Sequence, residues 1–550
     1  MQKIRWVLAG ILACLLIAGG AYIWTSELMD SLYAYRSPLH ATAPQPGQPV
    51  SAALTRRVVF VLIDALREDT SLRSEVMPFL SDLRDRGARA TMHSRPPSYS
   101  QPGYTTLLTG VWPDLNDGHM VNVDYADIRR FTQDDLFSAA HRAGLRTAVS
   151  GYHWFEKMIP PAAVDASFYT PGEDAAADRA VTDAALPWLR DGGYRLTLIH
   201  LDQVDCAGHH EGGPRDPRWD AAARRADDLL REIAGTLDLT KDTLFVCSDH
   251  GQIDGGGHGG QDPITLVEPW VLMGAGIKPG RYADVQMVDV APTLAVLLGA
   301  NLPASAQGRP QTEMLALSAE RLAAVERATA GQQAALTQAY SAAIGRPVAA
   351  GAAGNVVAAT QAAMDAARAG RLTAERLPRG VVAAILALIP AAILYRKRGR
   401  TMAWLLGGAV LYVGLFNLRY AVLSGRTYSL SSAASANELI LYGAITAAVA
   451  LVISWLVVAL GLRPWQGGPR GAAELSLAFT LTVIYLLSLP ILTGFALDGL
   501  LVGWTLPDFG RMFLAFLSGL QVLVVAFLGI VLTGLAAAVI WGLRRRNPMM

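Results

Sequence analysis

Six long apolar stretches constrain this chain more than any other feature, because only a bilayer or a very large core can bury them. The first runs from Trp6 to Trp24 and, at about 1.5 Å per residue, is just long enough to cross a hydrocarbon core. Five more follow at about residues 380–395, 402–418, 437–462, 473–497 and 511–543. The sequence therefore predicts an integral membrane protein with six spans.

The first stretch could also be a cleaved signal peptide, although no clear small-x-small cleavage site follows it. Residues 11–14 weakly resemble a lipidation box, but the apolar run continues past Cys14. We therefore expect a retained membrane anchor over residues 1–37. The chain has three cysteines: Cys14, Cys206 and Cys247. Their spacing matches neither a disulfide framework nor a metal-binding motif, so we expect each of them to be a small buried residue.

Basic residues set the expected orientation, because lysine and arginine favour the cytoplasmic side of a membrane. Basic clusters follow the second, fourth and sixth stretches, at 396–400, 463–470 and 544–546. Placing both termini in the cytoplasm puts all three clusters inside, and residues 25–379 then lie outside, in a periplasmic, extracellular or lumenal space. Arg419 and Arg426 are exceptions on the outer side.

Composition separates a globular part from the membrane part. Hydrophobic residues make up 52% of the chain and charged residues 17%, and the apolar excess lies in residues 380–550, a predicted bundle of five spans. Residues 38–54 are rich in proline and alanine and read as a linker. Residues 316–379 are alanine-rich and predict a helical hairpin, with a gap around Gly345–Gly354, that connects the globular part to the bundle. The net charge of +1 provides no field that would attract nucleic acid.

Residues 55–315 have the pattern of an α/β domain. Three short apolar runs each end at acidic residues: 57–63 before Asp64, 195–201 before Asp202 and Asp205, and 243–248 before Asp249 and His250. Continuous apolar runs are typical of parallel strands that are buried on both faces. A helical pattern at 219–233 alternates with them, so we expect a mostly parallel sheet flanked by helices, with ligands beyond the carboxyl ends of the strands.

Carboxylate and imidazole side chains gather at these predicted strand ends. Asp205 and His209 are four residues apart in an expected turn, and His258 lies in a glycine-rich loop that can fold close to a metal. These ligands suit Zn²⁺, with Mn²⁺ as the alternative, and two ions about 3.5–4 Å apart could hold a phosphoryl group. A single Asp after a strand is ordinarily a turn or cap residue, so the prediction depends on the whole set: Asp64, Asp205, His209, Asp249, His250 and His258.

Ser100 is the candidate nucleophile. It lies just before the helical pattern TTLLTG, and a hydroxyl at a helix N-terminus faces free N–H groups that also suit a phosphate. A coordinated metal would generate the alkoxide at neutral pH. The alternative role for Ser100 is that of a helix N-cap.

Four segments in this order resemble the alkaline phosphatase superfamily, especially its type I phosphodiesterase/nucleotide pyrophosphatase and GPI ethanolamine-phosphate transferase branches. They are VVFVLIDALRED (58–69), PPSYSQPGYTTLLTGVWP (96–113), HLDQVDCAGHHEGG (200–213) and SDHGQIDGGGHGG (248–260), with weaker matches at 150–160 and 288–303. The resemblance implies two metal sites with Ser100 bound nearby. One would consist of Asp205, His209 and His258, and the other of Asp64, Asp249 and His250.

The resemblance further implies attack by Ser100, a covalent phospho-enzyme, and transfer to water or to an acceptor alcohol. These branches usually have a threonine where Ser100 stands, and serine keeps the hydroxyl. Gly103 stands where the pyrophosphatases have a phosphate-contacting asparagine, which argues against their nucleotide-type substrate. Candidate substrate contacts are Gln101, Gly103, His153 and Trp154, with core packing as the alternative for Trp154.

An anchor, an outer catalytic domain and a multi-span bundle resemble the layout of the ethanolamine-phosphate transferases. We therefore expect transfer of a phosphoethanolamine-type group to or from a lipid or lipid-linked glycan. The alternative is a membrane-bound phosphodiesterase or nucleotide pyrophosphatase. Arg419, Arg426 and Trp504 could meet lipid head groups or act as interfacial anchors.

Two other classes fit the sequence less well. A sulfatase is disfavoured because the chain has no Cys-x-Pro-x-Arg motif. A transporter or scaffold with an inactive enzyme domain is disfavoured because the set of six ligands is intact and few charges lie within the predicted spans.

Overall fold

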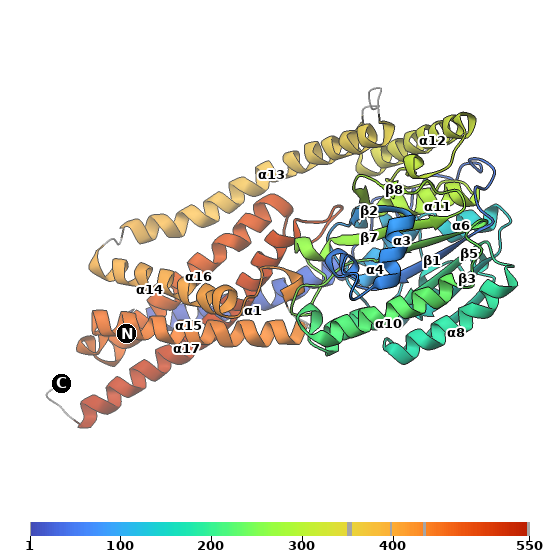
Figure 1. Cartoon of the computed structure of the whole chain (residues 1–550). Coiled ribbons are helices and arrows are strands. Elements are labelled where there is room, and N and C mark those ends of the chain that lie inside the picture. Colours follow the sequence, from blue (N-terminus) through green and yellow to red (C-terminus); the bar gives the residue numbers. More distant parts are fainter. Residues whose placement is uncertain (1, 349–354, 397–398, 433–435, 547–550) are drawn as a thin grey trace. The chain divides into compact units, whose positions relative to one another are not determined.

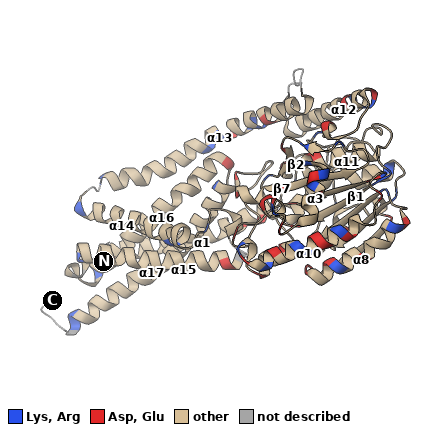
Figure 2. Ribbon diagram, viewed as in Figure 1, with Lys and Arg blue, Asp and Glu red and all other residues tan. Residues whose placement is uncertain are grey.

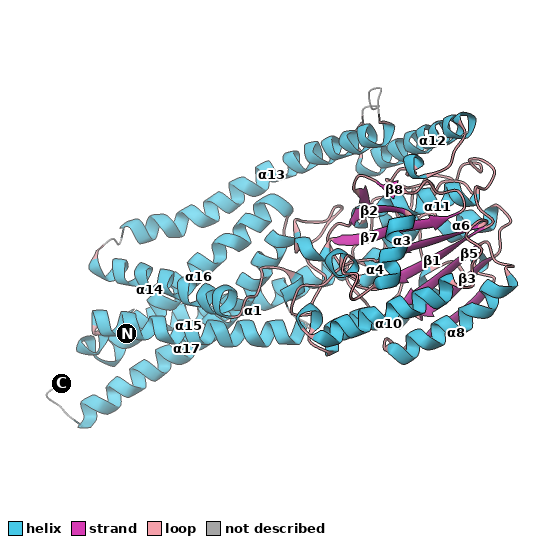
Figure 3. Cartoon of the chain, viewed as in Figure 1, coloured by secondary structure: helices cyan, strands magenta, loops and turns pink. Residues whose placement is uncertain are grey.

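The computed structural model describes the whole chain except residues 1, 349–354, 397–398, 433–435 and 547–550. The chain divides into two compact units (Figure 1). Unit 1 comprises residues 1–32, 372–503 and 507–550, and unit 2 comprises residues 33–371 and 504–506. Unit 2 contains the strands, and unit 1 consists mainly of long helices (Figure 3).

Unit 2 is built on one mixed sheet. Its strands are β1 (Arg57–Ile63), β2 (Ala88–His93), β3 (Thr147–Tyr152), β4 (Ala166–Thr170), β5 (Leu196–Leu201), β6 (Asp242–Cys247), β7 (Val267–Gly274), β8 (Gly280–Arg281) and β9 (Val285–Gln286). Their order is β4-β3-β5-β1-β6-β7-β2-β8, with β9 also paired to β2. β7 runs antiparallel to β6 and β2, while the other pairs are parallel. The predicted α/β fold with a mostly parallel sheet is confirmed.

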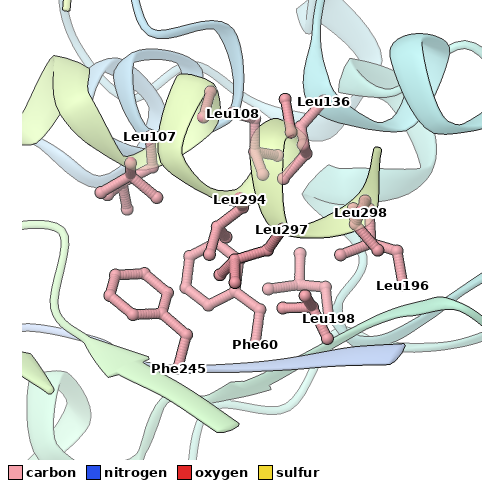
Figure 4. Close-up of a cluster of buried hydrophobic side chains, with 14 of the residues drawn as sticks. Phe60, Leu107, Leu108, Leu136, Leu196, Leu198, Phe245, Leu294, Leu297 and Leu298 are labelled. Atoms are coloured by element: carbon pink, nitrogen blue, oxygen red, sulfur yellow. The ribbon is translucent and has the colours of Figure 1, made fainter. Parts of the chain in front are cut away.

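The three strands predicted from apolar runs form the centre of this sheet. β1 lies between β5 and β6, and Val61 pairs with Ile199 on one side and with Val246 on the other. Every residue of the three strands is buried, because helices cover both faces of the sheet. On one face, Phe60 and Phe245 pack against Leu107 and Leu294 (Figure 4).

Two sets of helices provide this cover. α4 (Ser100–Thr109), α6 (Leu136–Arg142) and α11 (Val290–Leu298) pack on one face, and α3 (Pro78–Arg86), α8 (Ala175–Asp191) and α10 (Pro217–Ala234) on the other. The helix predicted at 219–233 is α10, whose apolar positions Trp219, Ala223 and Leu230 are buried. The remaining α-helices of unit 2 are α2 (Glu68–Ser71), α5 (Pro113–Asn116), α7 (Trp154–Met158), α9 (Gln203–His210) and α12 (Ala319–Ile344).

The two segments expected to connect domains have distinct structures. Residues 38–54 contain no helix or strand and lie along unit 2, where the N–H of Leu54 donates to the carbonyl of Leu297 at 2.9 Å. The connector contains α12 and the start of α13 (Val356–Arg396). Most of the gap expected between its two helices, residues 349–354, lies outside the described residues.

Six helices of the described chain are long and apolar enough to cross a membrane. They are Trp6–Tyr33 within α1 (Gln2–Tyr33), Val356–Arg396, Arg400–Leu423, Asn437–Leu462, Gly468–Asp498 and Phe509–Arg545. The last four correspond to α14 (Arg400–Asn417) with a π-helical extension (Leu418–Leu423), α15 (Ala436–Leu462), α16 (Gly468–Asp498) and α17 (Phe509–Arg546). Charged residues are sparse along α14 to α17 (Figure 2). Each predicted apolar stretch falls within one of these helices, as expected for a protein integrated in a membrane.

Candidate metal and phosphate site

The carboxyl ends of β1, β5 and β6 bring the candidate ligands together. Asp64 follows β1, and Asp249 and His250 follow β6. The segment after β5 is the short helix α9 and not the expected turn, because residues 203–210 complete a helical hydrogen-bonding pattern. Residues four apart share one face of a helix, and His209 Nε2 consequently lies 3.3 Å from Asp205 Oδ2.

The first cluster consists of Asp205, His209 and His258. His258 Nε2 lies 2.8 Å from His209 Nε2 and 3.5 Å from Asp205 Oδ1. On the other side of its ring, His258 Nδ1 lies 2.9 Å from the carbonyl oxygen of Ser98. A carbonyl only accepts, so Nδ1 carries the proton and the lone pair of Nε2 faces the cluster.

The second cluster consists of Asp64, Asp249 and His250. His250 Nε2 lies 3.4 Å from Asp64 Oδ1 and 3.3 Å from Asp249 Oδ2. His250 Nδ1 faces the carbonyl of Gly251 at 3.1 Å, so Nε2 is again the nitrogen that is free to bind a ligand. The rings of His250 and His258 stack with centroids 4.1 Å apart, so the two clusters adjoin.

A tight turn helps to place the second cluster. Ala65 adopts a left-handed backbone conformation with φ of 57°, which is uncommon for a residue other than glycine. Its N–H donates to Asp249 Oδ1 at 3.2 Å and thereby orients that carboxylate. The other oxygen, Oδ2, has no hydrogen-bond partner within the described chain and faces His250.

Charge balance tests whether cations fit these clusters. Asp64 and Asp249 are fully buried, and Asp64 Oδ1 and Asp249 Oδ2 accept no hydrogen bond from any described residue. Among the residues that the structure describes, no lysine or arginine forms an ion pair with Asp64, Asp205 or Asp249. Buried carboxylates without a cation are costly, and oxygen and imidazole donors suit Zn²⁺. The residues present therefore fit divalent metal ions.

The electrostatics of the clusters support the same conclusion. Burial, together with the charge of Asp64, raises the pKa of Asp249 well above its ordinary value. Burial opposes ionisation of Asp205 too, but His209 and His258 outweigh it and lower its pKa. The charge of Asp205 raises the pKa of His209 to about 9, while burial and His250 lower the pKa of His258 to about 3. At neutral pH Asp205 is thus ionised and His258 neutral, which are the forms that bind metals, whereas a bound cation would have to displace the protons that Asp249 and His209 retain.

Ser100 lies at the edge of the second cluster. Its Oγ is 3.1 Å from His250 Nε2, and the residue is 4% exposed. Tyr99 is the N-cap of α4 and Ser100 the first helical residue, so Ser100 is not the N-cap. Gly259 permits this arrangement, because its φ is 103° and a Cβ there would lie 2.2 Å from the Tyr99 ring.

The candidate substrate contacts differ in their surroundings. The Gln101 amide is engaged with the backbone of Val123, donating to its oxygen at 2.9 Å and accepting from its nitrogen at 3.3 Å. At Gly103, a Cβ would lie 2.9 Å from the Cβ of Asp249, so glycine permits close packing there. His153 stacks on Tyr125 at 4.4 Å, and Trp154 lies 6.5 Å from Tyr104 between ring centroids.

Sequence reasoning missed four residues of the site. Asn122 lies at the start of α4, where its Oδ1 accepts from the Gln101 N–H at 3.1 Å. Its amide nitrogen donates to no other described residue and is therefore available to a ligand. No local pattern in the sequence marks this asparagine, because it reaches the site from a loop 22 residues after Ser100.

The other three missed residues surround Asp64. The Tyr104 hydroxyl donates to Asp64 Oδ2, and His200 Nε2 lies 3.0 Å from the same oxygen. Asp202 joins Asp64 and His200 in a third group of candidate ligand atoms. Two features of the sequence could have indicated these residues. Tyr104 lies one helical turn after Ser100, and His200 and Asp202 lie at the end of β5.

A sheet edge that gathers buried carboxylates, imidazoles and a helix-terminal hydroxyl is the type of centre that binds metal ions for phosphate chemistry. Residues 58–305 match the family model described as type I phosphodiesterase / nucleotide pyrophosphatase. The resemblance to that branch, predicted from the sequence, is therefore confirmed for this part of the chain.

Curated relatives extend the comparison. The chain is 28% identical over 309 residues to the catalytic subunit of GPI ethanolamine phosphate transferase 2 of Homo sapiens, covering 50% of this chain and 31% of that protein. It is 26% identical over 356 residues to the catalytic subunit of GPI ethanolamine phosphate transferase 3 of Mus musculus, and this match covers 57% of this chain and 32% of that protein. The match thus spans about a third of the length of these relatives.

Solved structures similar to this chain include human ectonucleotide pyrophosphatase / phosphodiesterase 5 and a mutant alkaline phosphatase. The first is 14% identical with a TM-score of 0.38, and covers 44% of this chain and 95% of its own. The second is 12% identical with a TM-score of 0.40, and the match covers 48% of this chain and 100% of the other chain.

Proposed function

We propose that this chain is a membrane-integrated, two-metal phosphotransferase that moves a phosphoethanolamine-type group to or from a lipid or lipid-linked glycan. The observation that carries the proposal is the position of Ser100, whose hydroxyl lies 3.1 Å from His250 Nε2 at the N-terminus of α4. The substrate class is supported by the names of the curated relatives, which are ethanolamine phosphate transferases, and by the six apolar helices.

Two divalent ions, Zn²⁺ or alternatively Mn²⁺, would be held by the two clusters, and would polarise the phosphate and lower the pKa of the Ser100 hydroxyl. Ser100 Oγ would attack phosphorus in line. The Oγ–P bond forms as the bond from phosphorus to the leaving alcohol breaks. The amide of Asn122 and the N-terminus of α4 would stabilise the phosphate oxygens. An acceptor hydroxyl would then displace Ser100 from phosphorus, and its proton would restore the serine.

The proposed organisation places an anchor at residues 1–37, a catalytic domain at 55–315, a connector at 316–379 and the membrane bundle at 380–550. The catalytic domain would face away from the cytoplasm, and both termini would lie inside. The distribution of basic residues after alternate spans supports this orientation.

Labelling of single cysteines by a membrane-impermeant reagent in intact cells tests this orientation, in a chain whose Cys14, Cys206 and Cys247 are first replaced by alanine. Gly172→Cys reports on the catalytic domain, and Gly467→Cys reports on the loop after Asn437–Leu462, on the opposite side. We expect the reagent to label Gly172→Cys in intact cells and Gly467→Cys only after the membrane is permeabilised. The reverse pattern would overturn the orientation.

A trapped intermediate tests the chemistry. The purified full chain is analysed for bound metal, incubated with phosphatidylethanolamine labelled in its head group, quenched with acid and digested. We expect Zn²⁺ or Mn²⁺ in the protein and a phosphoethanolamine adduct on Ser100 in the peptide that contains residues 96–113. Ser98 serves as an internal control, because its hydroxyl is bonded to Gly260 and Thr265. An adduct on Ser98 would overturn the assignment of the nucleophile.

The second candidate is a membrane-bound phosphodiesterase or nucleotide pyrophosphatase that uses water as acceptor. The match of residues 58–305 to that family model favours it. Hydrolysis of p-nitrophenyl phosphodiesters at a rate that no acceptor alcohol changes, without transfer from labelled lipid, would establish the hydrolase and exclude the transferase. A protein without metal, whose cellular role survives Asp249→Ala, would instead be a scaffold or transporter.

A further inference from the structure

Unit 1 contains a cavity that the proposed chemistry does not use. It has a volume of about 300 Å³ and lies where α14 widens into the π-helical segment Leu418–Leu423, against α15. Its walls are mainly apolar and include Leu415, Leu423, Val449 and Ile453. π-Helical turns often mark functional sites, because the wider turn displaces side chains from the regular helix surface.

One end of the cavity is polar. The Arg419 guanidinium lies over the ring of Tyr442, with its carbon 5.1 Å from the ring centroid. The Tyr442 and Ser424 hydroxyls both donate to the carbonyl oxygen of Arg419, at 3.3 Å and 2.7 Å. These bonds satisfy a carbonyl that the π-helical segment leaves near the end of the helix, and they fix Arg419 at the lining of the cavity.

The charge of Arg419 has no acidic partner in the described part of the chain, where no carboxylate forms an ion pair with its guanidinium. Arg426 provides the contrast. It lies over the same Tyr442 ring at 4.4 Å, but it forms an ion pair with Glu438. The two arginines therefore differ in charge balance: Arg426 is paired with a carboxylate of the protein, while Arg419 presents a positive charge, unpaired among the described residues, beside an apolar cavity.

An arginine at a membrane interface ordinarily extends its guanidinium into water, where the charge is solvated without any bound ligand. Arg419 is instead a half-buried residue whose guanidinium lies over an aromatic ring beside the cavity. An apolar cavity that ends at a fixed cation is complementary to an acyl chain that is attached to a phosphate.

We propose that this cavity binds one glycerophospholipid, with an acyl chain against Leu415, Val449 and Ile453 and the phosphate at Arg419. The guanidinium can donate two parallel hydrogen bonds to phosphate oxygens, which a lysine cannot do. The inference concerns binding by unit 1 alone and does not depend on the proposed transferase chemistry.

Photolabelling tests the proposal on the full chain in detergent micelles. Two probes are compared at equal concentration: phosphatidylglycerol with a diazirine in one acyl chain, and diacylglycerol with the same chain. We expect phosphatidylglycerol to label residues 415–424 and 442–453 more strongly than diacylglycerol. Arg419→Gln should lower this labelling about tenfold, as expected for the loss of a charge-assisted hydrogen bond. Val449→Trp should lower it by filling the apolar end.

Arg470→Gln is the matched control, because it removes an arginine of unit 1 whose charge is paired with Glu474. Arg419→Lys should restore only part of the labelling. Melting curves of each variant show that the fold is retained. Equal labelling by the two probes, or an unchanged yield in Arg419→Gln, would overturn the proposal and leave only non-specific contact with lipid. The readout is binding, so loss of catalytic activity cannot be mistaken for failure of this site.

Discussion

The hydroxyl of Ser100 lies 3.1 Å from Nε2 of His250, and this contact joins the start of α4 to the loop after β6. His250 in turn faces Asp64 and Asp249. A phosphate bound here would therefore meet the proposed nucleophile and the second cluster of candidate metal ligands together.

Ser100→Ala should reduce transfer at least about 10³-fold, because the reaction loses its nucleophile. Ser100→Thr should retain measurable transfer, since it keeps the hydroxyl. Thr106→Ser is the control within α4, because the Thr106 hydroxyl is bonded to the carbonyl of Pro102. Initial rates with labelled lipid provide the measurement. Full activity of Ser100→Ala would refute the role of this residue.

His258→Ala and Asp249→Asn should each remove the metal of one cluster, leaving about one ion per chain, because each cluster supplies its own ligands. Elemental analysis of the purified variants measures this directly. His210→Ala is the control, because this neighbour of His209 is exposed and belongs to neither cluster. An unchanged metal content in both variants would contradict the assignment.

Tyr104→Phe should weaken metal binding at the second cluster about 10–100-fold, as is typical when a group that orients a ligand is lost. Its hydroxyl donates to Asp64. Competition with a chelator measures the affinity. Tyr152→Phe is a matched control near the site, because the Tyr152 hydroxyl bonds to Glu173 at 2.6 Å and not to a candidate ligand. Equal chelator sensitivity of the two variants would argue against a positioning role.

Asn122→Ala should lower the rate of transfer about 10²-fold, which is typical for the loss of one hydrogen-bond donor to a developing charge. The metal content should not change, because Asn122 lies outside both clusters. Single-turnover rates together with elemental analysis separate the two effects. A variant that loses metal and rate together would indicate a structural role instead.

Asp135→Asn should flatten the pH dependence of stability. Burial raises the pKa of Asp135, the N-cap of α6, to about 6, above the ordinary value of about 3.9. Between these values the folded state binds more protons than the unfolded state, so this group stabilises the fold as pH falls from 7 towards 4. Asparagine can still accept the N-cap hydrogen bonds of α6, but its side chain does not titrate and so cannot take up the proton.

The melting temperature at pH 7 and pH 5 measures this effect in the full chain. The wild type should gain more from the change to pH 5 than Asp135→Asn does. Asp174→Asn at the exposed N-cap of α8 is the control and should behave like the wild type. Equal pH responses of wild type and Asp135→Asn would contradict the prediction.

Local patterns in the sequence were sufficient for the elements that depend on local composition. The continuous apolar run of β1 and the length of the helix Asn437–Leu462 reflect the burial of each segment as a whole. A strand buried on both faces and a span surrounded by lipid must be apolar throughout, so their composition shows their environment. The carboxylates and imidazole that follow the strands were also evident, because they come directly after these apolar runs in the sequence.

Contacts between distant segments were decided only by the tertiary structure. Tyr104 and His200 meet at Asp64 because β5 pairs with β1 and α4 covers their ends, and no spacing in the chain encodes that order. Trp504, expected at a membrane interface, lies 4.1 Å from the guanidinium of Arg371 and packs in unit 2. The sequence by itself determined what each segment must bury and which chemical groups it carries. Only the pairing of strands and the packing of helices determined which of these groups meet, because such contacts depend on the path of the whole chain.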